Sequence, residues 1–493
     1  MQINVKMGHY QRKAPHLSVK CDLIGEGNPF KMTFAKDTSP SSMLPEYAKY
    51  VRHLWRSPCS EDEYYNDILN YGNTVENPGN PFLSYAIFLA SEAFRLPKKV
   101  PMIKLEDVFT RTDLHIWKSS PGLPWKEKGY LKKSQIRANP EAVEEVLNFW
   151  RDILSGIKRE PDDTMVVNKR HITTRGQHKI RAIMCYPATI NFGEVIFTTP
   201  LTDEYVKGGS PIAFGYETLC GGAMKISREC IAEWYTASDF KAFDKSVPVF
   251  LLQAAFSILK SNINFNAYEN STEIPNANGM ELMFDYIRDY FIHTPFRLFD
   301  GYRYKKDGGI ASGSGFTTLI GSIVNYILIQ WASLDQNGIP RYIKVFGDDS
   351  ICGHSYKFDI VRANDLFKLI RMSLNLQKSE VTKNLAELSF LGFQINYGYP
   401  KKEFDRWMAS LVYPDTNDKN WDTVASRALS LLYCCCGFNL EFDKICREIV
   451  LRRDFEFKPP KRAFYLRMLG MDPENLKKNP PSPEELRRRL TEV

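Results

Sequence analysis

The alternation of hydrophobic and polar positions is clearest between residues 342 and 352, where it predicts a β-hairpin. β-branched and aromatic residues lie on both sides of Gly347-Asp348, and glycine accepts the positive φ that a tight turn requires. Such a turn would hold Asp348 and Asp349 together at the edge of a sheet. Adjacent carboxylates repel each other unless a cation lies between them, and oxygen ligands suit Mg²⁺. A Gly-Asp-Asp-Ser string occurs by chance in roughly one chain in ten of this length, so the interpretation needs partners elsewhere.

Two longer apolar patterns predict helices. The longest runs from Phe316 to Leu334 and carries Thr, Ser, Asn and Gln on several faces, which favours a buried helix over a membrane span. Another begins with Asn139 as the cap and Pro140 in the first turn, and its apolar stripe continues to Leu154. We interpret the second helix as structural, and we expect no membrane association.

Composition narrows the class of protein only slightly. The 493 residues are enough for two or three domains or for one large, multi-lobed domain. The 65 basic residues exceed the 58 acidic ones by seven, which allows a basic groove but no dominant basic tail. The ten cysteines show no CxxC spacing, which argues against a zinc site or a secreted disulfide framework.

A basic segment lies between residues 169 and 183. Lys179 and Arg181 alternate with apolar residues, so on a strand both cations face one side. Lys169 and Arg175 can reach the same side from the preceding arm. Cations at this density repel one another unless a polyanion is present, which suits a triphosphate or a nucleic-acid backbone. A solvated basic hairpin is the alternative.

Two acidic residues follow in the spacing Asp-x4-Asp. Asp239 comes at the C-terminal end of a predicted short strand, where functional carboxylates often lie. Asp244 precedes a helix that opens after Pro248, so a simple capping role is the alternative for this residue.

Two loops rich in small residues could bind anionic groups. Residues 308–317 lead into the long buried helix and offer backbone N–H groups and hydroxyls to phosphate or sugar oxygens, although the Gly-Lys-Ser/Thr of nucleotide hydrolases is absent. The rigid loop from Ser119 to Pro124 could hold a phosphate or a backbone strand. An ordinary Pro/Gly turn is the alternative for this second loop.

Taken in order, these motifs resemble those of viral RNA-dependent RNA polymerases. The series consists of a basic strand, Asp-x4-Asp, Ser-Gly-x3-Thr on a helix and Gly-Asp-Asp on a hairpin, followed by Leu376-Gln377-Lys378-Ser379 and a strand at residues 389–393. They follow the family's order of motifs G, F, A, B, C, D and E over roughly residues 115–415. Motifs A, B and C are most similar to those of the partitivirus and picobirnavirus group, which have double-stranded RNA genomes.

The resemblance assigns a role to each motif residue. Asp239, Asp348 and Asp349 would bind two Mg²⁺ ions, for which Mn²⁺ can substitute, and Lys378 would act as a general acid toward pyrophosphate. The resemblance implies nucleotide binding by the residues of motifs F, A and B, namely Lys169, Arg175, Lys179, Arg181, Asp244, Ser312, Gly313 and Thr317. Asp244 would accept a hydrogen bond from the ribose 2′-hydroxyl. The motif G loop would guide the template through Ser119, Ser120, Gly122 and Pro124.

One position departs from the pattern of the family. Many members place Asn four residues after the motif B threonine, to partner the second motif A aspartate, and here that position is Gly321. The nearest asparagine, Asn325, lies one further helical turn away and is our candidate for orienting Asp244.

The resemblance also implies an α+β fold of right-hand form, with fingers, palm and thumb and a small antiparallel palm sheet backed by helices. The domains expected from it are an N-terminal extension with fingertip contacts (1–100), fingers (101–235), palm with motif A (236–260), a fingers insertion (261–305), palm with motifs B to E (306–412), and thumb with C-terminal tail (413–493).

The expected function is RNA synthesis from ribonucleoside triphosphates on an RNA template, for transcription and replication of a viral genome. RNA template, RNA product and nucleotides would be the partners, with the viral capsid protein as a further one, in the virion interior or the host cytoplasm. A reverse transcriptase-like enzyme is one alternative, but such enzymes carry a bulky aromatic residue where Asp244 stands. A catalytically inactive RNA-binding protein is another, yet binding alone has no need of carboxylates that repel phosphate.

Overall fold

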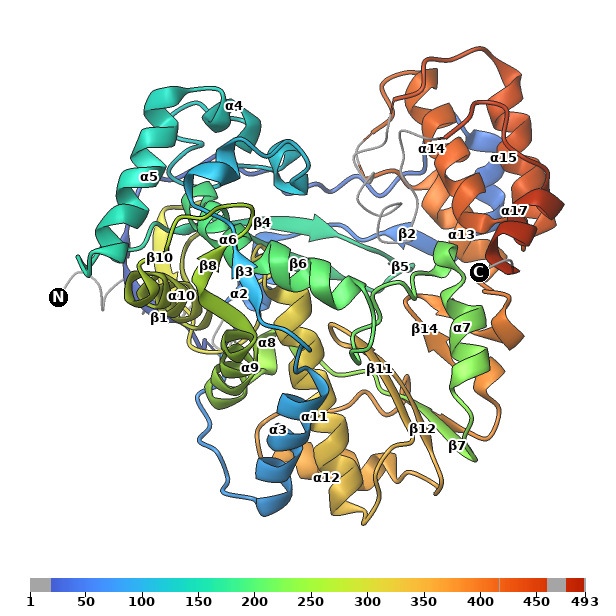
Figure 1. Cartoon of the computed structure of the whole chain (residues 1–493). Coiled ribbons are helices and arrows are strands. Elements are labelled where there is room, and N and C mark those ends of the chain that lie inside the picture. The colour runs from blue at the N-terminus through green and yellow to red at the C-terminus, as the bar shows by residue number, and fades with distance from the viewer. Residues whose placement is uncertain (1–18, 416, 459–475, 492–493) are drawn as a thin grey trace.

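The computed structural model describes residues 19–415, 417–458 and 476–491. Residues 1–18 of the expected N-terminal extension therefore lie outside the described part of the chain, as do residues 459–475 of the expected thumb. Figure 1 shows three groups of elements, with the palm elements below and the expected fingers and thumb above on opposite sides.

A four-stranded antiparallel sheet forms the expected palm. Its strand order is β11-β12-β7-β13, and the register pairs Val345 with Ser350 across the predicted hairpin and Cys352 with Thr236 on the next strand. These strands are β7 (Trp234–Ala237), β11 (Tyr342–Phe346), β12 (Asp349–His354) and β13 (Glu380–Thr382). The prediction of a small antiparallel palm sheet is confirmed, although β7 ends two residues before Asp239.

Helices pack behind this sheet, and the long apolar pattern forms the most buried of them. Helix α11 (Thr317–Asp335) is buried along most of its length, and it packs against α3 (Pro81–Ala93) and β11. Among the described residues, it is the one helix long and apolar enough to cross a membrane, and 83% of its apolar window is buried inside the protein. The prediction of a buried helix is confirmed. The other helices of this region are α8 (Phe243–Ser246), α9 (Val249–Ser261) and α12 (Ile360–Lys368).

A second sheet of five strands, ordered β1-β10-β9-β4-β6, lies in the expected fingers. The basic segment forms β4 and β6 in antiparallel register, and β1 from the N-terminal region completes the far edge of the sheet. The strands are β1 (Asp22–Glu26), β4 (Thr164–Arg170), β6 (Ile180–Cys185), β9 (Pro295–Arg297) and β10 (Tyr302–Lys305). The surrounding helices are α2 (Glu61–Ile68), α4 (Lys133–Arg137), α5 (Pro140–Leu154), α6 (Ala188–Val206) and α10 (Ala277–Ile292). Helix α7 (Gly222–Glu229) packs instead in a smaller cluster with Ala237 of β7 and Ile351 of β12.

The cap predicted for α5 is present, because the Asn139 side chain accepts hydrogen bonds from the backbone N–H groups of Glu141 and Ala142. Residues 262–278 are rich in asparagine, and by composition alone they would be interpreted as a loose loop. They contain β8 (Ile263–Tyr268), which pairs in parallel with β3 (Val100–Met102). Such pairing depends on a partner far away in the sequence, so the local asparagine-rich composition concealed the strand.

The C-terminal helices form a separate hydrophobic cluster that includes N-terminal residues. Leu44, Val51 and Leu54 are buried in this cluster, and Figure 1 shows the blue N-terminal segment between the orange and red helices. This segment forms a 3₁₀ helix (Pro45–Val51) followed by strand β2 (Leu54–Arg56), which pairs with β5 (Ile172–Thr174). The remaining elements of this region are β14 (Ser389–Phe390), β15 (Phe393–Gln394), α13 (Phe404–Val412), α14 (Trp421–Cys435), α15 (Leu440–Arg452) and α17 (Pro483–Thr491).

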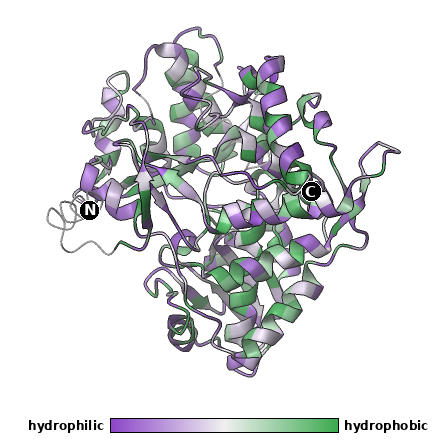
Figure 2. Cartoon of the chain, turned by 90° about the vertical axis from the view of Figure 1, so that its left-hand side faces the viewer, coloured by the Kyte–Doolittle hydropathy of each residue, from purple (hydrophilic) through white to green (hydrophobic). Residues whose placement is uncertain are grey.

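The hydrophobic residues of most helices lie along one side, as in Figure 2, where purple and green alternate along the outer helices. This amphipathic pattern buries the apolar faces in one large cluster that extends across the expected fingers and palm. The functional side chains described next lie where the strands and loops around this cluster end.

Candidate active site

The aspartates singled out in the sequence meet at one edge of the palm sheet. Because β12 runs antiparallel to β7 with Cys352 opposite Thr236, Asp349 comes level with Asp239 just beyond the end of β7. Asp348 occupies the turn between β11 and β12, next to Gly347, whose φ is +61°. Sheet register therefore brings together carboxylates that are more than a hundred positions apart in the sequence.

The carboxylates influence one another's ionisation. The side chains of Asp348 and Asp349 reach solvent, but surrounding protein atoms displace enough water to raise the pKa of both. The negative charges of Asp348 and Asp239 add to this effect and raise the pKa of Asp349 to about 7. A cation placed among these oxygens would relieve the repulsion.

This donor set fits a hard divalent cation that also takes oxygens from its substrate. In the described part of the chain, no group of three or more His, Cys, Asp or Glu side chains could hold a metal ion by itself. Mg²⁺ is usually held by one or two carboxylates, with water and substrate phosphates completing the shell. Asp239, Asp348 and Asp349 supply carboxylates of this type, so the residues present fit the expected metal.

The basic strand faces these carboxylates. Lys169 lies directly opposite Arg181 in the β4–β6 register, so both side chains share one face of the sheet. Partial burial lowers the pKa of Lys179, and the positive charges of Arg181 and Lys378 lower it further. Arg181 in turn favours the charged form of Asp348. The structure thus places the cations of motifs F and D around the motif A and C aspartates, as the site of an anionic ligand requires.

Arg175 is placed differently from the expectation. Its Nε atom donates to the Arg52 carbonyl at 2.9 Å, and its guanidinium lies 5.9 Å from the ring centre of Trp55. The tip of the basic arm therefore packs on the N-terminal segment. These contacts place Arg175 at the junction of the arm with β2, and its contact with a nucleotide stays a prediction.

The prediction that Asn325 orients Asp244 is wrong. The Asn325 amide donates to the carbonyls of Gly347 and Asp349, at 3.1 and 3.2 Å, and so holds the metal-site turn. Gly321 packs closely against that turn, because a Cβ there would be 3.2 Å from Gly347 Cα, which is a tight contact. Asp244 instead accepts a 2.8 Å hydrogen bond from the hydroxyl of Tyr71.

The motif B loop is tied to the end of β6. Ser312 Oγ accepts from the Met184 N–H at 3.2 Å, and a Cβ on Gly313 would come within 2.2 Å of the Met184 carbonyl oxygen, so glycine is required there. Thr317 donates to the carbonyls of Ala311 and Ser314 within its own loop. Its hydroxyl therefore braces the loop.

Sequence reasoning missed Glu194, a buried carboxylate on α6 that holds the same loop. Glu194 accepts hydrogen bonds from the Ser314 hydroxyl and from the Gly315 N–H at 2.9 Å, and burial raises its pKa to about 7. A glutamate inside an apolar helical stretch is a signal of a special role, since buried carboxylates need partners.

The loop expected to guide the template packs beside the motif B loop. Gly122 has φ of +65°, and a Cβ there would lie 2.4 Å from the Tyr186 carbonyl oxygen. Ser119 Oγ accepts from Lys133 Nζ at 2.7 Å, while Ser120 Oγ accepts from the Gly122 N–H at 3.4 Å. Pro124 completes this loop and is partly buried. Residues 184–186 therefore support both loops.

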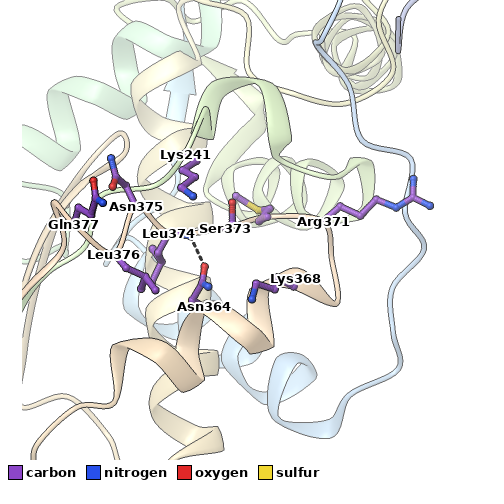
Figure 3. A pocket seen from close by; sticks show the side chains of 10 residues that line it. Lys241, Asn364, Lys368, Arg371, Ser373, Leu374, Asn375, Leu376 and Gln377 are labelled. Atoms are coloured by element: carbon purple, nitrogen blue, oxygen red, sulfur yellow. Dashed lines mark hydrogen bonds between the residues drawn. The ribbon is translucent and has the colours of Figure 1, made fainter. Parts of the chain in front are cut away.

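The turn before Lys378 is bonded to motif A. Asn375 donates its backbone N–H to the Asp239 carbonyl at 2.7 Å, and the Asp239 N–H donates to Ser379 Oγ at 3.0 Å. A pocket lined by Lys241, Lys368 and residues 371–377 opens beside this contact, where the Arg371 side chain points away and Asn364 bonds the Leu374 backbone (Figure 3). The position of Asp239 thus depends directly on the Lys378 turn.

An antiparallel palm with paired aspartates, faced by a basic strand and bounded by separate finger and thumb groups, defines a right-hand nucleic-acid polymerase. The sequence model of the family described as viral RNA-dependent RNA polymerase matches residues 29–445. The chain belongs to this viral RNA-dependent RNA polymerase family, and it synthesises RNA on an RNA template.

Individual relatives agree with this assignment. The chain is 26% identical over 391 residues to the RNA-directed RNA polymerase of Cryptosporidium parvum virus 1 (strain KSU-1), covering 73% of this chain and 70% of the relative. It is 24% identical to the RNA-directed RNA polymerase of Atkinsonella hypoxylon virus (isolate 2H), and the match covers 62% of this chain and 51% of the relative. For White clover cryptic virus 1 (isolate Boccardo/2004) the identity is 25%, with coverage of 59% and 52%.

A solved structure shows the same fold. The Sicinivirus 3Dpol RNA dependent RNA polymerase superposes with a TM-score of 0.66 at 14% identity, covering 92% of this chain and 100% of that one. The α+β right-hand fold expected from the motifs is confirmed. Membership of the family also implies RNA and nucleotides as substrates and a general dependence on divalent metal.

Proposed function

We propose that this polymerase transcribes and replicates the genome of a double-stranded RNA virus, using two Mg²⁺ ions held by Asp239, Asp348 and Asp349. The observation that carries the metal assignment is the meeting of these three carboxylates at one sheet edge, where burial, together with the negative charges of Asp348 and Asp239, raises the pKa of Asp349 to about 7. When bound, such ions activate the primer 3′-hydroxyl and neutralise the leaving pyrophosphate.

The chain's own residues would orient the nucleotide. Lys179 and Arg181 face the carboxylates and would pair with the triphosphate, with Lys169 beside Arg181 on the same face. Arginine suits this position because its planar fork binds two phosphate oxygens and stacks on a base. Lys378 lies close enough to influence Lys179 and would protonate the pyrophosphate as it leaves.

The two supported loops would act on sugar and template. Asp244 would accept a hydrogen bond from the ribose 2′-hydroxyl, with Ser312, Gly313 and Thr317 shaping the wall beside it. The loop from Ser119 to Pro124 would guide the template, because it is held rigidly against residues 184–186 next to the motif B loop. Association with the capsid protein, in the virion interior or the host cytoplasm, belongs to this proposal through the resemblance of the motifs to those of double-stranded RNA viruses.

The test is RNA synthesis by the purified chain from four ribonucleotides, on single-stranded and double-stranded RNA templates, with Mg²⁺ or with chelator. We expect synthesis on both templates that stops without the metal, and we expect Asp348→Ala to abolish synthesis while RNA binding persists, because contacts that position RNA lie elsewhere. Asp365→Ala is the control, since Asp365 pairs with Lys368 at the surface. Robust synthesis by Asp348→Ala would contradict the metal assignment. Failure on double-stranded RNA alone would contradict the proposed genome type.

A further inference from the structure

The partner of Asp244 comes from the N-terminal region. Tyr71 lies just after α2, is fully buried, and donates its hydroxyl to Asp244 Oδ2 at 2.8 Å. Among the residues that the structure describes, no other side-chain hydrogen bond or ion pair is made by this carboxylate. In this chain Gly321 replaces the motif B asparagine that is usual in the family, and Tyr71 supplies the hydrogen bond to Asp244 in its place.

Tyr71 is fixed in position by its surroundings. The Cys21 thiol donates to the Tyr71 carbonyl at 3.2 Å, and the neighbouring Gly72 N–H donates to the Lys245 carbonyl at 3.0 Å. The ring packs against Gly309, where a Cβ would come within 3.1 Å of Tyr71 Cδ1. A side chain held from several directions can hold its own partner in one geometry.

The same segment also joins motif A to the basic strand. Asp67 on α2 forms an ion pair with Lys245 and accepts a 2.7 Å hydrogen bond from the Ala182 N–H, next to Arg181. Tyr71 and Asp67 therefore position motif A through Asp244 and Lys245. The N-terminal region is built into the nucleotide site.

The hydroxyl of Tyr71 can act only as a donor to Asp244. Burial and the negative charge of Asp244 raise the pKa of Tyr71 well above its ordinary value, so the phenol keeps its proton. With Oδ2 engaged by Tyr71, Oδ1 of Asp244 remains to accept a hydrogen bond from a sugar hydroxyl.

We propose that Tyr71 is a positioning residue for sugar selection, whose hydroxyl fixes Asp244 so that its free oxygen meets the ribose 2′-hydroxyl. This inference rests on the proposed role of Asp244. Without the Tyr71 hydroxyl the Asp244 carboxylate can rotate or turn to water, and the contact that distinguishes ribose from deoxyribose weakens. The loss falls on ribonucleotides, because a deoxyribonucleotide never makes this contact.

The experiment measures the ratio of kcat/KM for a ribonucleotide to that for its 2′-deoxy counterpart. We expect Tyr71→Phe to lower this ratio about tenfold, as loss of a hydrogen bond to a charged group does. Tyr64→Phe is the matched control, because Tyr64 is a buried tyrosine of the same segment whose hydroxyl donates to the Val166 carbonyl at 2.9 Å instead. We expect the control to keep the wild-type ratio. The ratio is independent of the fraction of correctly folded enzyme.

Asp244→Ala and the double variant separate the possible failures. We expect Asp244→Ala to lower the ratio, and Tyr71→Phe to add nothing further in that background. If Asp244→Ala lowers the ratio but Tyr71→Phe does not, the inference about Tyr71 is overturned while the role of Asp244 stands. An equal effect of Tyr71→Phe with and without Asp244 also overturns it. If Asp244→Ala leaves the ratio unchanged, both assignments fall together.

Discussion

Arg181 lies among charges of both signs. It favours ionisation of Asp348, and it adds, together with Lys378, to the burial that lowers the pKa of Lys179. Burial and the nearby cations Arg181, Lys179 and Lys169 lower the pKa of His171 to about 4, so this histidine stays neutral and adds no charge. An anionic ligand would therefore relieve the repulsion among these cations, and Arg181 interacts with Lys179, His171 and Asp348.

Arg181→Lys keeps the charge but removes the fork that grips phosphate oxygens. We expect the KM for nucleotide to rise about 10- to 100-fold, since a hydrogen bond to a charged group contributes about 1.5–3 kcal/mol. Template affinity and its salt dependence should change little, and steady-state kinetics with RNA-binding assays at two salt concentrations measure both. Arg175→Lys is the matched control, because Arg175 contacts the Arg52 carbonyl. An unchanged nucleotide KM for Arg181→Lys would exclude Arg181 from the site.

Asn325 gives a second prediction at this scale. Because its amide holds the carbonyls of Gly347 and Asp349, Asn325→Ala should shift the turn and lower kcat by up to about a hundredfold. Discrimination between ribose and deoxyribose should stay at the wild-type level, since Asp244 is held by Tyr71. Gln330→Ala on the same helix, where the side chain donates to Tyr326, serves as the control. A large loss of sugar discrimination would show that Asn325 acts on Asp244 after all.

At the scale of elements, α6 supports the two loops that would contact template and sugar. Glu194 binds the motif B loop, and the segment just before the helix packs against the motif G loop. Lys133, which donates to Ser119 Oγ, is itself buried, and burial lowers its pKa to about 8. Two buried ionisable groups thus fix two adjacent loops.

Glu194 makes the stability of this element depend on pH. Its pKa rises from 4.5 to about 7 on folding, so the ionised carboxylate costs the folded state roughly 3 kcal/mol. A carboxyl whose folded pKa is raised imposes no cost at pH values where both states are protonated. The cost grows as the pH rises above 4.5 and becomes constant above about 7.

Glu194→Gln removes this titration while keeping an oxygen that accepts and an amide that donates. We compare the free energies of unfolding of the variant and the wild type by denaturant titration. We expect the difference, variant minus wild type, to increase by about 2–3 kcal/mol from pH 5 to pH 8. Glu204→Gln, on the same helix but in a surface ion pair with Lys207, should show no such gain. A difference that stays constant with pH would contradict the assignment.

Sequence patterns located those elements whose formation depends on near neighbours. The Gly-Asp-Asp hairpin, α5 with its Asn139 cap and the buried α11 all have local signals, namely turn chemistry, a cap or a sustained apolar period. β8 was missed because it exists through pairing with β3. The motif aspartates could be identified, whereas Tyr71 could not, since its partner is 173 positions away and a tyrosine near a turn carries no sign of its contact.

At the scale of the whole molecule, residues 41–56 join the thumb to the fingers. Arg56 of β2 is buried, and it donates to the carbonyls of Arg170 and Tyr413 and forms a 2.8 Å ion pair with Asp415. The Tyr413 hydroxyl donates back to the Leu54 carbonyl at 2.9 Å. One side chain therefore connects the basic arm, the N-terminal segment and the start of the thumb.

Arg56→Ala should weaken this junction. Arg56 is buried whereas the Asp415 side chain is 33% exposed, so the main cost is the loss of the donor to the buried carbonyls of Arg170 and Tyr413, about 1–3 kcal/mol. We expect a lower free energy of unfolding and weaker RNA binding, measured by denaturant titration and by filter binding. Arg95→Ala, which removes an exposed pair with Glu92, should change stability by less than about 1 kcal/mol. Equal stability of the two variants would show that the junction does not depend on Arg56.

The placement of Leu44, Val51 and Leu54 inside the thumb cluster has a consequence for the order of synthesis. These residues leave the ribosome hundreds of residues before α13, which packs against their 3₁₀ helix, and before α14 and α15, which complete the cluster. Until then the early segment exposes apolar side chains that have no other place to pack, so it depends on chaperones or on provisional contacts. A nascent chain halted before residue 404 cannot bury this segment in the thumb, whatever the state of its palm. Closure of the thumb on this segment therefore follows the synthesis of the fingers and palm.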